Sequence, residues 1–300
     1  MQKTPQALAE TAAPSSPRWG YTMEELATAP MVFREDLYRG KVVLVTGGGG
    51  GFGRAMTFMF ARLGATVLIS GRKADKLEQT ASGVRRLLGL DCVHTFPMTI
   101  RNPDECTALI DHAFDHCGGL DLLVNNAGGQ FPQSAIDFSV KGWLAVIDTN
   151  LNGTWYMMQA AARRWRASGS AGSIVNIVAN VWRGMPQVAH TCAARAGVIY
   201  LSKTLATEWA PYGIRVNCVS PGSINSEGLN VYEPAAAEEF RNSNPMRKLG
   251  DAYDVGQAVA YVGSPAGSFT TGDVLVVDGG NSQWGDVWPA GKPDYFRVPG

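Results

Sequence analysis

The sequence predicts one α/β domain built on a doubly wound, seven-stranded parallel sheet. From Lys41 onward, short β-branched runs alternate with amphipathic segments of helical length, which is typical of βαβ units. A glycine-rich turn, which starts at Thr46, directly follows the first such run and opens a helical segment. Strand, glycine turn and helix in this order are the elements with which a Rossmann-type sheet holds a nucleotide.

Each strand is expected where aliphatic and β-branched residues run together between turn residues. The predicted strands are Val42–Thr46, Thr66–Ser70, Cys92–Met98, Leu120–Val124, Ser173–Val178, Arg215–Val219 and Val274–Val277. Helices are predicted near residues 52–63, 73–88, 103–117, 139–167, 188–211 and 251–262. Right-handed crossovers between parallel strands then place helices on both faces of the sheet.

Outside residues 39–281 the pattern stops. Residues 1–38 are rich in Ala, Thr and Pro, and we expect an extension without regular structure, mobile up to about Pro17. The aromatic residues Trp19, Tyr21 and Phe33 would pin its last part to the domain. Residues 282–300 form an expected irregular tail that contains Trp284, Trp288, Tyr295 and Phe296. Within the domain, residues 223–250 interrupt the alternation before the last strand, where we expect a substrate lid.

Composition excludes several classes of protein. The chain has 26 basic and 26 acidic residues, so its zero formal charge argues against a nucleic-acid or anionic-membrane partner. Its five cysteines include no CxxC pair, which indicates reduced thiols, a cytoplasmic setting and no bound metal. No uncharged apolar run reaches 18 residues, and no signal-peptide pattern is present, so we expect no membrane span or leader.

The glycine-rich turn runs from Thr46 to Arg54. Its glycines, among them Gly47, Gly51 and Gly53, allow the backbone to approach a pyrophosphate, and Phe52 lies between the last two. The helix that follows presents free N–H groups and a positive dipole end to the anion. At the end of the second strand, Ser70 and Arg72 replace the acidic residue that holds the ribose of NAD, so the predicted cofactor is NADP(H).

These motifs resemble the short-chain dehydrogenase/reductase family over residues 38–281. Further matching motifs are Asn125–Gly128, Asp148–Leu151, Pro221–Ser226 and Val277–Gly280. The resemblance implies that Asn126, Ala127 and Gly128 line the adenosine side. It implies that Asn150 holds a helix kink and a water of a proton relay. It also implies that Pro221, Gly222, Ile224 and Ser226 contact the nicotinamide carboxamide.

The sequence departs from this family at the catalytic centre. The family places a Tyr, three residues and then a Lys on one helix, with a Ser on the strand before it; here these positions hold Thr191, Arg195 and Ala179. Thr lacks a phenol, Arg can still hold the ribose hydroxyls but cannot readily exchange a proton, and Ala donates no hydrogen bond. The remaining candidate donors near the nicotinamide are Thr191 and Asn180.

Other side chains near this centre have less specific readings. His190 has a suitable pKa for proton transfer, but a neighbouring residue on a helix points about 100° away, so we interpret it as a structural histidine. Trp143 and Trp182 are candidates for an apolar substrate pocket or for the core. Tyr200 is a candidate for the core or for an interface.

A narrower resemblance explains the altered centre. The segments His190–Val198, Asn125–Phe131, Ile100–Asn102 and Lys141–Trp143 are similar to the trans-2-enoyl-CoA and 2,4-dienoyl-CoA reductases of the family. Their chemistry adds hydride to an activated C=C bond, and the charge develops on a thioester or ketone oxygen that other donors can hold. We therefore expect an NADPH-dependent reductase of an α,β-unsaturated acyl thioester or enone, with a small hydrophobic substrate. The C-terminal residues Val298–Gly300 differ from a peroxisomal address, which favours the cytoplasm.

Three alternatives remain at this point. The chain could be a catalytically inactive NADP(H)-binding or structural protein, since a protein that only binds the cofactor would also keep the glycine-rich turn and Arg72. It could be a non-redox isomerase, lyase or cyclase on the same fold. An ordinary ketone reductase is disfavoured by the three exchanged residues. The family resemblance and the long helices near 139–167 and 188–211 further imply a homotetramer.

Overall fold

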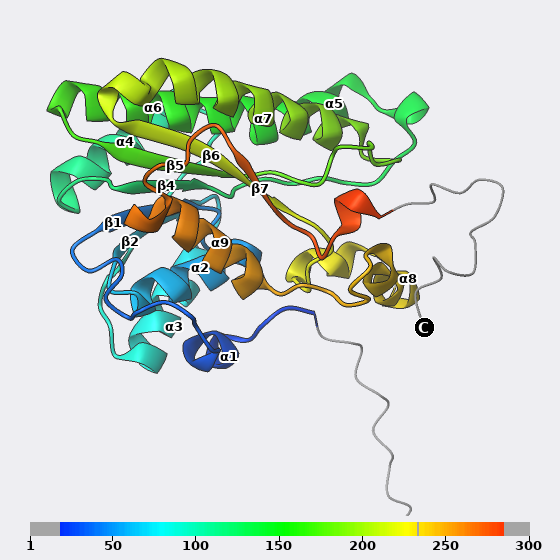
Figure 1. Ribbon diagram of the computed structural model, residues 1–300, viewed down its shortest axis with the longest axis horizontal. Helices are drawn as coiled ribbons and strands as arrows, with labels where there is room; N and C mark the ends of the chain where they lie inside the picture. The colour runs from blue at the N-terminus through cyan, green and yellow to red at the C-terminus, as the bar shows by residue number, and fades with distance from the viewer. Residues whose placement is uncertain (1–18, 233, 285–300) are drawn as a thin grey trace, which may run out of the picture.

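The computed structural model describes residues 19–232 and 234–284, and it confirms the doubly wound parallel sheet (Figure 1). The seven strands pair in the order β3-β2-β1-β4-β5-β6-β7, and every pairing is parallel. The strands are β1 (Val42–Thr46), β2 (Thr66–Gly71), β3 (Val93–Pro97), β4 (Leu122–Asn125), β5 (Gly172–Ile177), β6 (Ile214–Pro221) and β7 (Val274–Val277). The order reverses between β1 and β4, which is where a nucleotide binds in such a sheet.

Helices cover both faces of the sheet, as its right-handed crossovers require (Figure 1). On one face lie α1 (Met23–Thr28), α2 (Gly51–Arg62), α3 (Ala74–Leu88) and α9 (Ala252–Gly263). On the other lie α4 (Pro103–His116), α5 (Val140–Ile147), α6 (Gly153–Ser168) and α7 (Ala189–Trp209). Because both faces are covered, the central strands are mostly apolar, and all five residues of β1 are buried.

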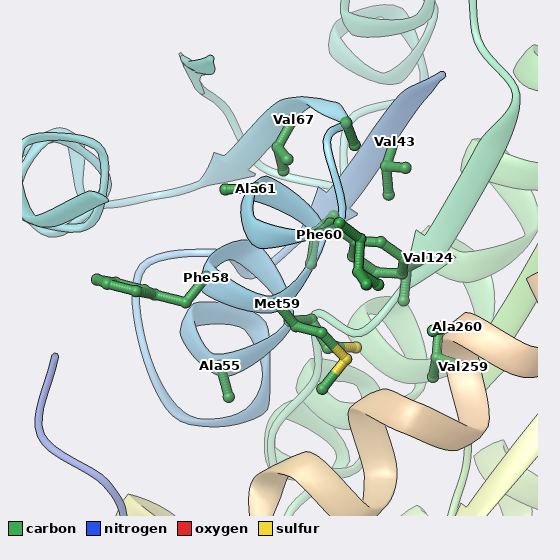
Figure 2. Close-up of a cluster of buried hydrophobic side chains, with 14 of the residues drawn as sticks. Val43, Ala55, Phe58, Met59, Phe60, Ala61, Val67, Val124, Val259 and Ala260 are labelled. Atoms are coloured by element: carbon green, nitrogen blue, oxygen red, sulfur yellow. The ribbon is translucent and has the colours of Figure 1, made fainter. Parts of the chain in front are cut away.

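Helix α2 fixes the glycine-rich turn to the core. Its side chains Phe58, Met59 and Phe60 are fully buried: Met59 and Phe60 point toward the sheet and α9, and Phe58 points to the other side, toward Gly83 of α3 (Figure 2). Each such side chain contributes about 1.5–3 kcal/mol by leaving water. The N-terminal end of α2 is therefore held rigidly at the carboxyl edge of the sheet, where β1 ends.

The N-terminal extension is more ordered than expected. Residues 23–28 form α1, because Thr22 and Glu25 make a capping box at its start, a pattern readable in the sequence that the prediction missed. Leu26 is 2% exposed, and Tyr21 and Phe33, two of the three aromatic residues expected to do so, pack beside it against the core. Residues 1–18 lie outside the described residues, as do Trp288, Tyr295 and Phe296 of the tail.

The helix predicted near 139–167 is two helices. Between α5 and α6, residues Asp148–Asn152 form a single π-helical turn, which places Asn150 at an irregularity like the kink that the resemblance implied. The interruption at 223–250 is also seen: this segment holds only short helices, η4 (Glu227–Val231), α8 (Pro234–Glu239) and η5 (Phe240–Ser243). None of the helices in the described ranges is both long and apolar enough to cross a membrane.

Candidate functional site

Two cavities open at the carboxyl edge of the sheet. The first, called here the turn cavity, has a volume of about 580 Å³ and runs from the glycine-rich turn past the ends of β2 and β3. The second, called here the lid cavity, has a volume of about 450 Å³ and lies between the end of β5, the end of β6 and the segment 223–243. Gln130 lines both cavities, so the two meet at the loop after β4.

The glycine-rich turn cannot be built from larger residues. A Cβ on Gly53 would collide with the carbonyl oxygen of Gly47, so the backbone of the turn closes on itself. Thr46 and Asn126 tie the turn to the loop after β4: the Asn126 amide donates to the Thr46 carbonyl (2.9 Å), and the Thr46 hydroxyl accepts from the N–H of Ala127 (2.9 Å). These polar residues hold the loops around the cavity in fixed positions. Phe52, at the tip of the turn, lines the lid cavity instead of the turn cavity.

The side of the turn cavity next to β2 is basic. Arg72, Lys73 and Lys76 line it, and none of the three forms an ion pair within the part of the chain that the structure describes. Ser70 lines the same cavity, and its buried hydroxyl has no partner there. Lys76 was missed from the sequence, although its position four residues after Arg72, at the start of α3, could have shown it. This arrangement fits a ribose that carries a 2′-phosphate.

The loop after β6 lines the lid cavity. Pro221, Gly222, Ile224 and Ser226 border it, as does Ala179, which follows β5. The parallel bridge between Ile224 and Gly250 closes the base of the lid segment. The residues that the resemblance assigned to the nicotinamide therefore share one cavity with the position of the missing Ser.

On α7, Thr191 and Arg195 are buried and line neither cavity. The Thr191 hydroxyl is buried without a partner among the described residues, and the side chain is 2% exposed. Arg195 donates to the carbonyl of Ile177 (2.8 Å) and has no carboxylate partner in the described ranges. Burial lowers the pKa of Arg195 to about 10. The site thus holds an uncompensated cation and an orphaned hydroxyl donor.

Asn150 and Arg195 meet at the loop after β4. The Asn150 side chain exchanges two hydrogen bonds with the backbone of Gly129, both 3.0 Å long. A Cβ on Gly128 would require the Arg195 guanidinium to shift, so the two residues are closely packed. The polar side chains of α7 and of the π-helical turn therefore position the loop that carries Gln130.

His190 is a buried structural residue, as the helix geometry predicted. Its ring lies between Phe131 (4.7 Å, edge-on) and Phe138 (4.5 Å, stacked), and Nδ1 accepts from the N–H of Thr191 (2.8 Å). Burial lowers the pKa of His190, which keeps the imidazole neutral. Its contacts support the segment 131–138, of which Phe131 also lines the turn cavity.

Several other expectations change. The Asn180 amide donates to Asp278 (3.1 Å) and Asn281 (2.6 Å), although the residue borders the lid cavity. Trp143 and Trp182 are 36% and 47% exposed and line neither cavity, so both readings, pocket and core, were wrong. Tyr200 is 70% exposed and therefore not a core residue. Gln130, which the sequence reasoning missed, is exposed and has no hydrogen-bond partner among the described residues.

Comparisons with known proteins agree with this geometry. A model of the family described as Enoyl-(Acyl carrier protein) reductase matches residues 47–282, and a short-chain dehydrogenase from Bacillus anthracis is 38% identical with a TM-score of 0.72. The chain belongs to the short-chain dehydrogenase/reductase family. As a member of this family it is an oxidoreductase that uses a nicotinamide cofactor.

Its relatives include enoyl-thioester reductases. A probable 2,4-dienoyl-CoA reductase from Bacillus subtilis (strain 168) is 38% identical over 255 residues, which cover 83% of this chain and 98% of that one. The peroxisomal 2,4-dienoyl-CoA reductase of Arabidopsis thaliana is 34% identical over 259 residues, covering 83% and 86%. Among solved structures, a citronellol catabolism dehydrogenase from Pseudomonas aeruginosa PAO1 is 36% identical, with a TM-score of 0.75 and coverage of 84% and 99%.

Proposed function

We propose that this protein reduces the C=C bond of an α,β-unsaturated acyl thioester with NADPH. One observation carries the proposal: a complete nucleotide cradle lies beside a helix in which Thr191 and Arg195 replace the phenol and amine of ordinary carbonyl reduction. Carbonyl reduction needs a proton donor at the oxygen bonded to the carbon that receives hydride. Enoyl reduction instead places the developing charge on the thioester oxygen, three bonds from the carbon that receives hydride. The printed names of the relatives, enoyl and dienoyl reductases, support the same chemistry.

The preference for NADPH rests on charge. Arg72, Lys73 and Lys76 line the turn cavity without a carboxylate partner in the described part of the chain, so a bound 2′-phosphate would neutralise them. NADH offers only a hydroxyl at this place. Fluorescence titration should therefore give a lower dissociation constant for NADPH than for NADH, and tighter NADH would contradict this preference.

The chain's own side chains would act as follows. When bound, the reduced nicotinamide supplies a hydride for the β-carbon of the substrate. Gln130, exposed where the two cavities meet, would donate its amide hydrogen bond to the thioester oxygen as negative charge develops there. Arg195, which lines neither cavity, would act on the cofactor through the loop at Gly128 that its guanidinium contacts. The α-carbon would take its proton from water in the lid cavity, because Thr191 is closed off from that cavity.

The test is NADPH consumption with crotonyl-CoA and longer trans-2-enoyl-CoAs. We expect turnover with members of this series and little with simple ketones. If no member of the series causes NADPH oxidation, acyl thioesters are excluded as substrates and enones remain. Gln130→Ala should lower kcat while NADPH still binds, and Gln130→Asn should restore part of the rate.

A non-catalytic role has one observation in its favour. Thr191 and Arg195, at two of the three exchanged positions, line neither cavity, as expected of a protein that only binds NADP(H). In that case NADPH would bind, but no enoyl, ketone or aldehyde substrate would accelerate its oxidation.

We further propose that the protein is a cytoplasmic homotetramer. All five cysteines are free, as expected of a reducing compartment. The exposed apolar side chains Val140, Leu144 and Tyr200 on α5 and α7 offer an apolar face to other copies.

A further inference from the structure

The last described segment of the chain borders the lid cavity. Asn281, Ser282 and Trp284 line it, directly after β7. The carboxylate of Asp278, at the end of β7, accepts from the N–H of Gly280 (2.8 Å) and from the N–H of Ser282 (2.6 Å). These two bonds turn the chain back over the cavity instead of letting it leave the sheet edge.

Side chains from two other segments hold this segment. From the loop after β5, the Arg183 guanidinium donates to the carbonyls of Ser282 (2.7 Å) and Trp284. From the segment 223–250, the Arg247 guanidinium lies 5.6 Å from the centre of the Trp284 ring. Trp284 is therefore held through its backbone by Arg183 and through its indole by Arg247.

The backbone at Arg247 is strained in a way that agrees with this role. Its φ of 52° lies in the left-handed region, which side chains other than Gly, Asn and Asp rarely adopt. Such strain persists where the surrounding structure requires it, and it is common beside binding sites. Here the strained residue is the one that covers the indole.

Part of the lining of the lid cavity is apolar. Met185 from the loop after β5 and Leu229, Tyr232 and Phe240 from the lid segment line it with Trp284, and the rings of Tyr232 and Phe240 pack edge-on at 5.0 Å. Gln130 and Ala179, which follow β4 and β5, line the same cavity. An acyl chain, whose carbons gain most from leaving water, fits this apolar lining.

We propose that Trp284 is the wall that limits the length of the acyl chain, and that Arg183 is a positioning residue that holds this wall. The inference rests on the proposed enoyl-thioester reduction and adds the residue that selects among its substrates. Both terminal nitrogens of Arg183 already donate to carbonyls of the segment, which is the arrangement of a clamp.

The test compares kcat/KM over trans-2-enoyl-CoAs from four to sixteen carbons for the wild type, Trp284→Ala and Trp284→Phe. In Trp284→Ala we expect the optimum to shift to longer chains, with kcat/KM gaining about fourfold for each further methylene that the widened cavity buries. Trp284→Phe should give an intermediate optimum. Arg183→Ala should shift it in the same direction through KM for the long substrates, with little change in kcat for crotonyl-CoA. Trp182→Ala is the matched control, because this tryptophan is exposed and lines neither cavity.

A binding series separates this inference from the proposed function. Dissociation constants of saturated acyl-CoAs of the same lengths, measured by calorimetry, need no turnover. Suppose that the wild type reduces no enoyl-CoA but binds acyl-CoAs up to a certain length, and that Trp284→Ala extends this length. The proposed function would then be wrong, whereas the role of Trp284 in limiting chain length would be supported. An unchanged length profile in Trp284→Ala, or an equal loss at every length, would overturn the wall, as would acyl-CoA binding that does not depend on length.

Discussion

At Arg195 a guanidinium stands where the family places a lysine, and burial gives this exchange a physical consequence. The side chain is 8% exposed, has one carbonyl partner and lacks a carboxylate partner among the residues described, so its charge is poorly compensated. Burial lowers its pKa only to about 10, so the group stays charged at neutral pH. It therefore cannot readily deliver a proton, and together with Thr191 and Ala179 it separates the site from ordinary carbonyl reduction.

Arg72 should decide between the two nicotinamide cofactors. Replacing it by Ala removes charge-assisted hydrogen bonds to the 2′-phosphate, which are worth about 1.5–3 kcal/mol, so the dissociation constant for NADPH should rise roughly tenfold to a hundredfold. NADH binding should change little. Fluorescence titration of both cofactors measures this, with Arg85→Ala as control, since Arg85 lies at the other end of α3 and pairs with Asp91. Equal weakening of both cofactors would contradict the role.

His190 should make stability depend on pH. Burial lowers the pKa of His190 in the folded state below 6.5, the value for the unfolded chain. Near and below pH 6.5 the unfolded chain therefore binds more protons at this residue than the folded protein does. The free energy of unfolding should therefore fall as pH drops from 7.5 through 6.5. His190→Phe keeps the ring between Phe131 and Phe138 without a titrating group, so urea unfolding should show a smaller fall. A variant that loses as much stability as the wild type would exclude His190 as the source.

Among the elements, the N-terminal segment braces the lid and the glycine-rich turn together. The N–H of Gly20 donates to Asn225 (2.6 Å) at the base of the lid, and the Tyr21 hydroxyl donates to Asp251 (2.9 Å) at the start of α9. Glu227, two residues after Asn225, pairs with Arg54 of α2 (2.8 Å). The segment is therefore part of the domain, although the family model begins only at residue 47.

Leu26 tests how firmly this segment is held. Leu26→Ala removes a side chain that is 2% exposed in the cluster beneath α2, and should lower the free energy of unfolding by about 2–5 kcal/mol. Val32→Ala is the control, because Val32 is 80% exposed and should change stability by less than about 0.5 kcal/mol. Both are measured by urea unfolding at one protein concentration. If Leu26→Ala unfolds at the wild-type midpoint, the segment does not contribute to the cooperative unit.

The elements also show what a sequence can and cannot predict. Strands β1 and β7 were predicted to the residue, because both are runs of aliphatic residues between turn residues. Only β1 is fully buried, whereas β7 at the edge of the sheet is partly exposed. Helix α1 was missed because six residues give too short a hydrophobic period, although its capping box was legible. The split between α5 and α6 was placed only by the family resemblance, since a π-helical turn leaves the apolar pattern almost unchanged.

The site could be predicted less completely than the fold, for a physical reason. Thr46, Gly53 and Arg72 could be assigned to the site from short sequence motifs, because their proposed roles depend on residues next to them in the sequence. Gln130 depends on contacts between segments far apart, as does the clamp of Arg183 on Trp284. The hydrophobic periodicity of a sequence does not predict contacts between distant segments, so these contacts are seen only in the folded structure.

At the scale of the whole molecule, α5, α6 and α7 form one outer layer of the fold (Figure 1). Tyr200 on α7 is 70% exposed, and Val140 and Leu144 on α5 are 76% and 46% exposed. A monomer would leave these side chains in water, whereas an interface of standard size, about 1,600 Å², would bury them. The opposite layer, with α2, α3 and α9, carries the N-terminal segment on its surface (Figure 1).

We therefore expect light scattering to give a mass close to four times the 32.1 kDa of the chain. Tyr200→Arg, which places a charge at this layer, should lower the mass and make the melting temperature depend more steeply on protein concentration. Val32→Arg, equally exposed but in the N-terminal segment, should leave both unchanged. A wild-type mass of one chain at micromolar concentration would contradict the tetramer. Activity that survives in a dissociated Tyr200→Arg variant would then show that each chain holds a complete site, as the two cavities within one chain predict.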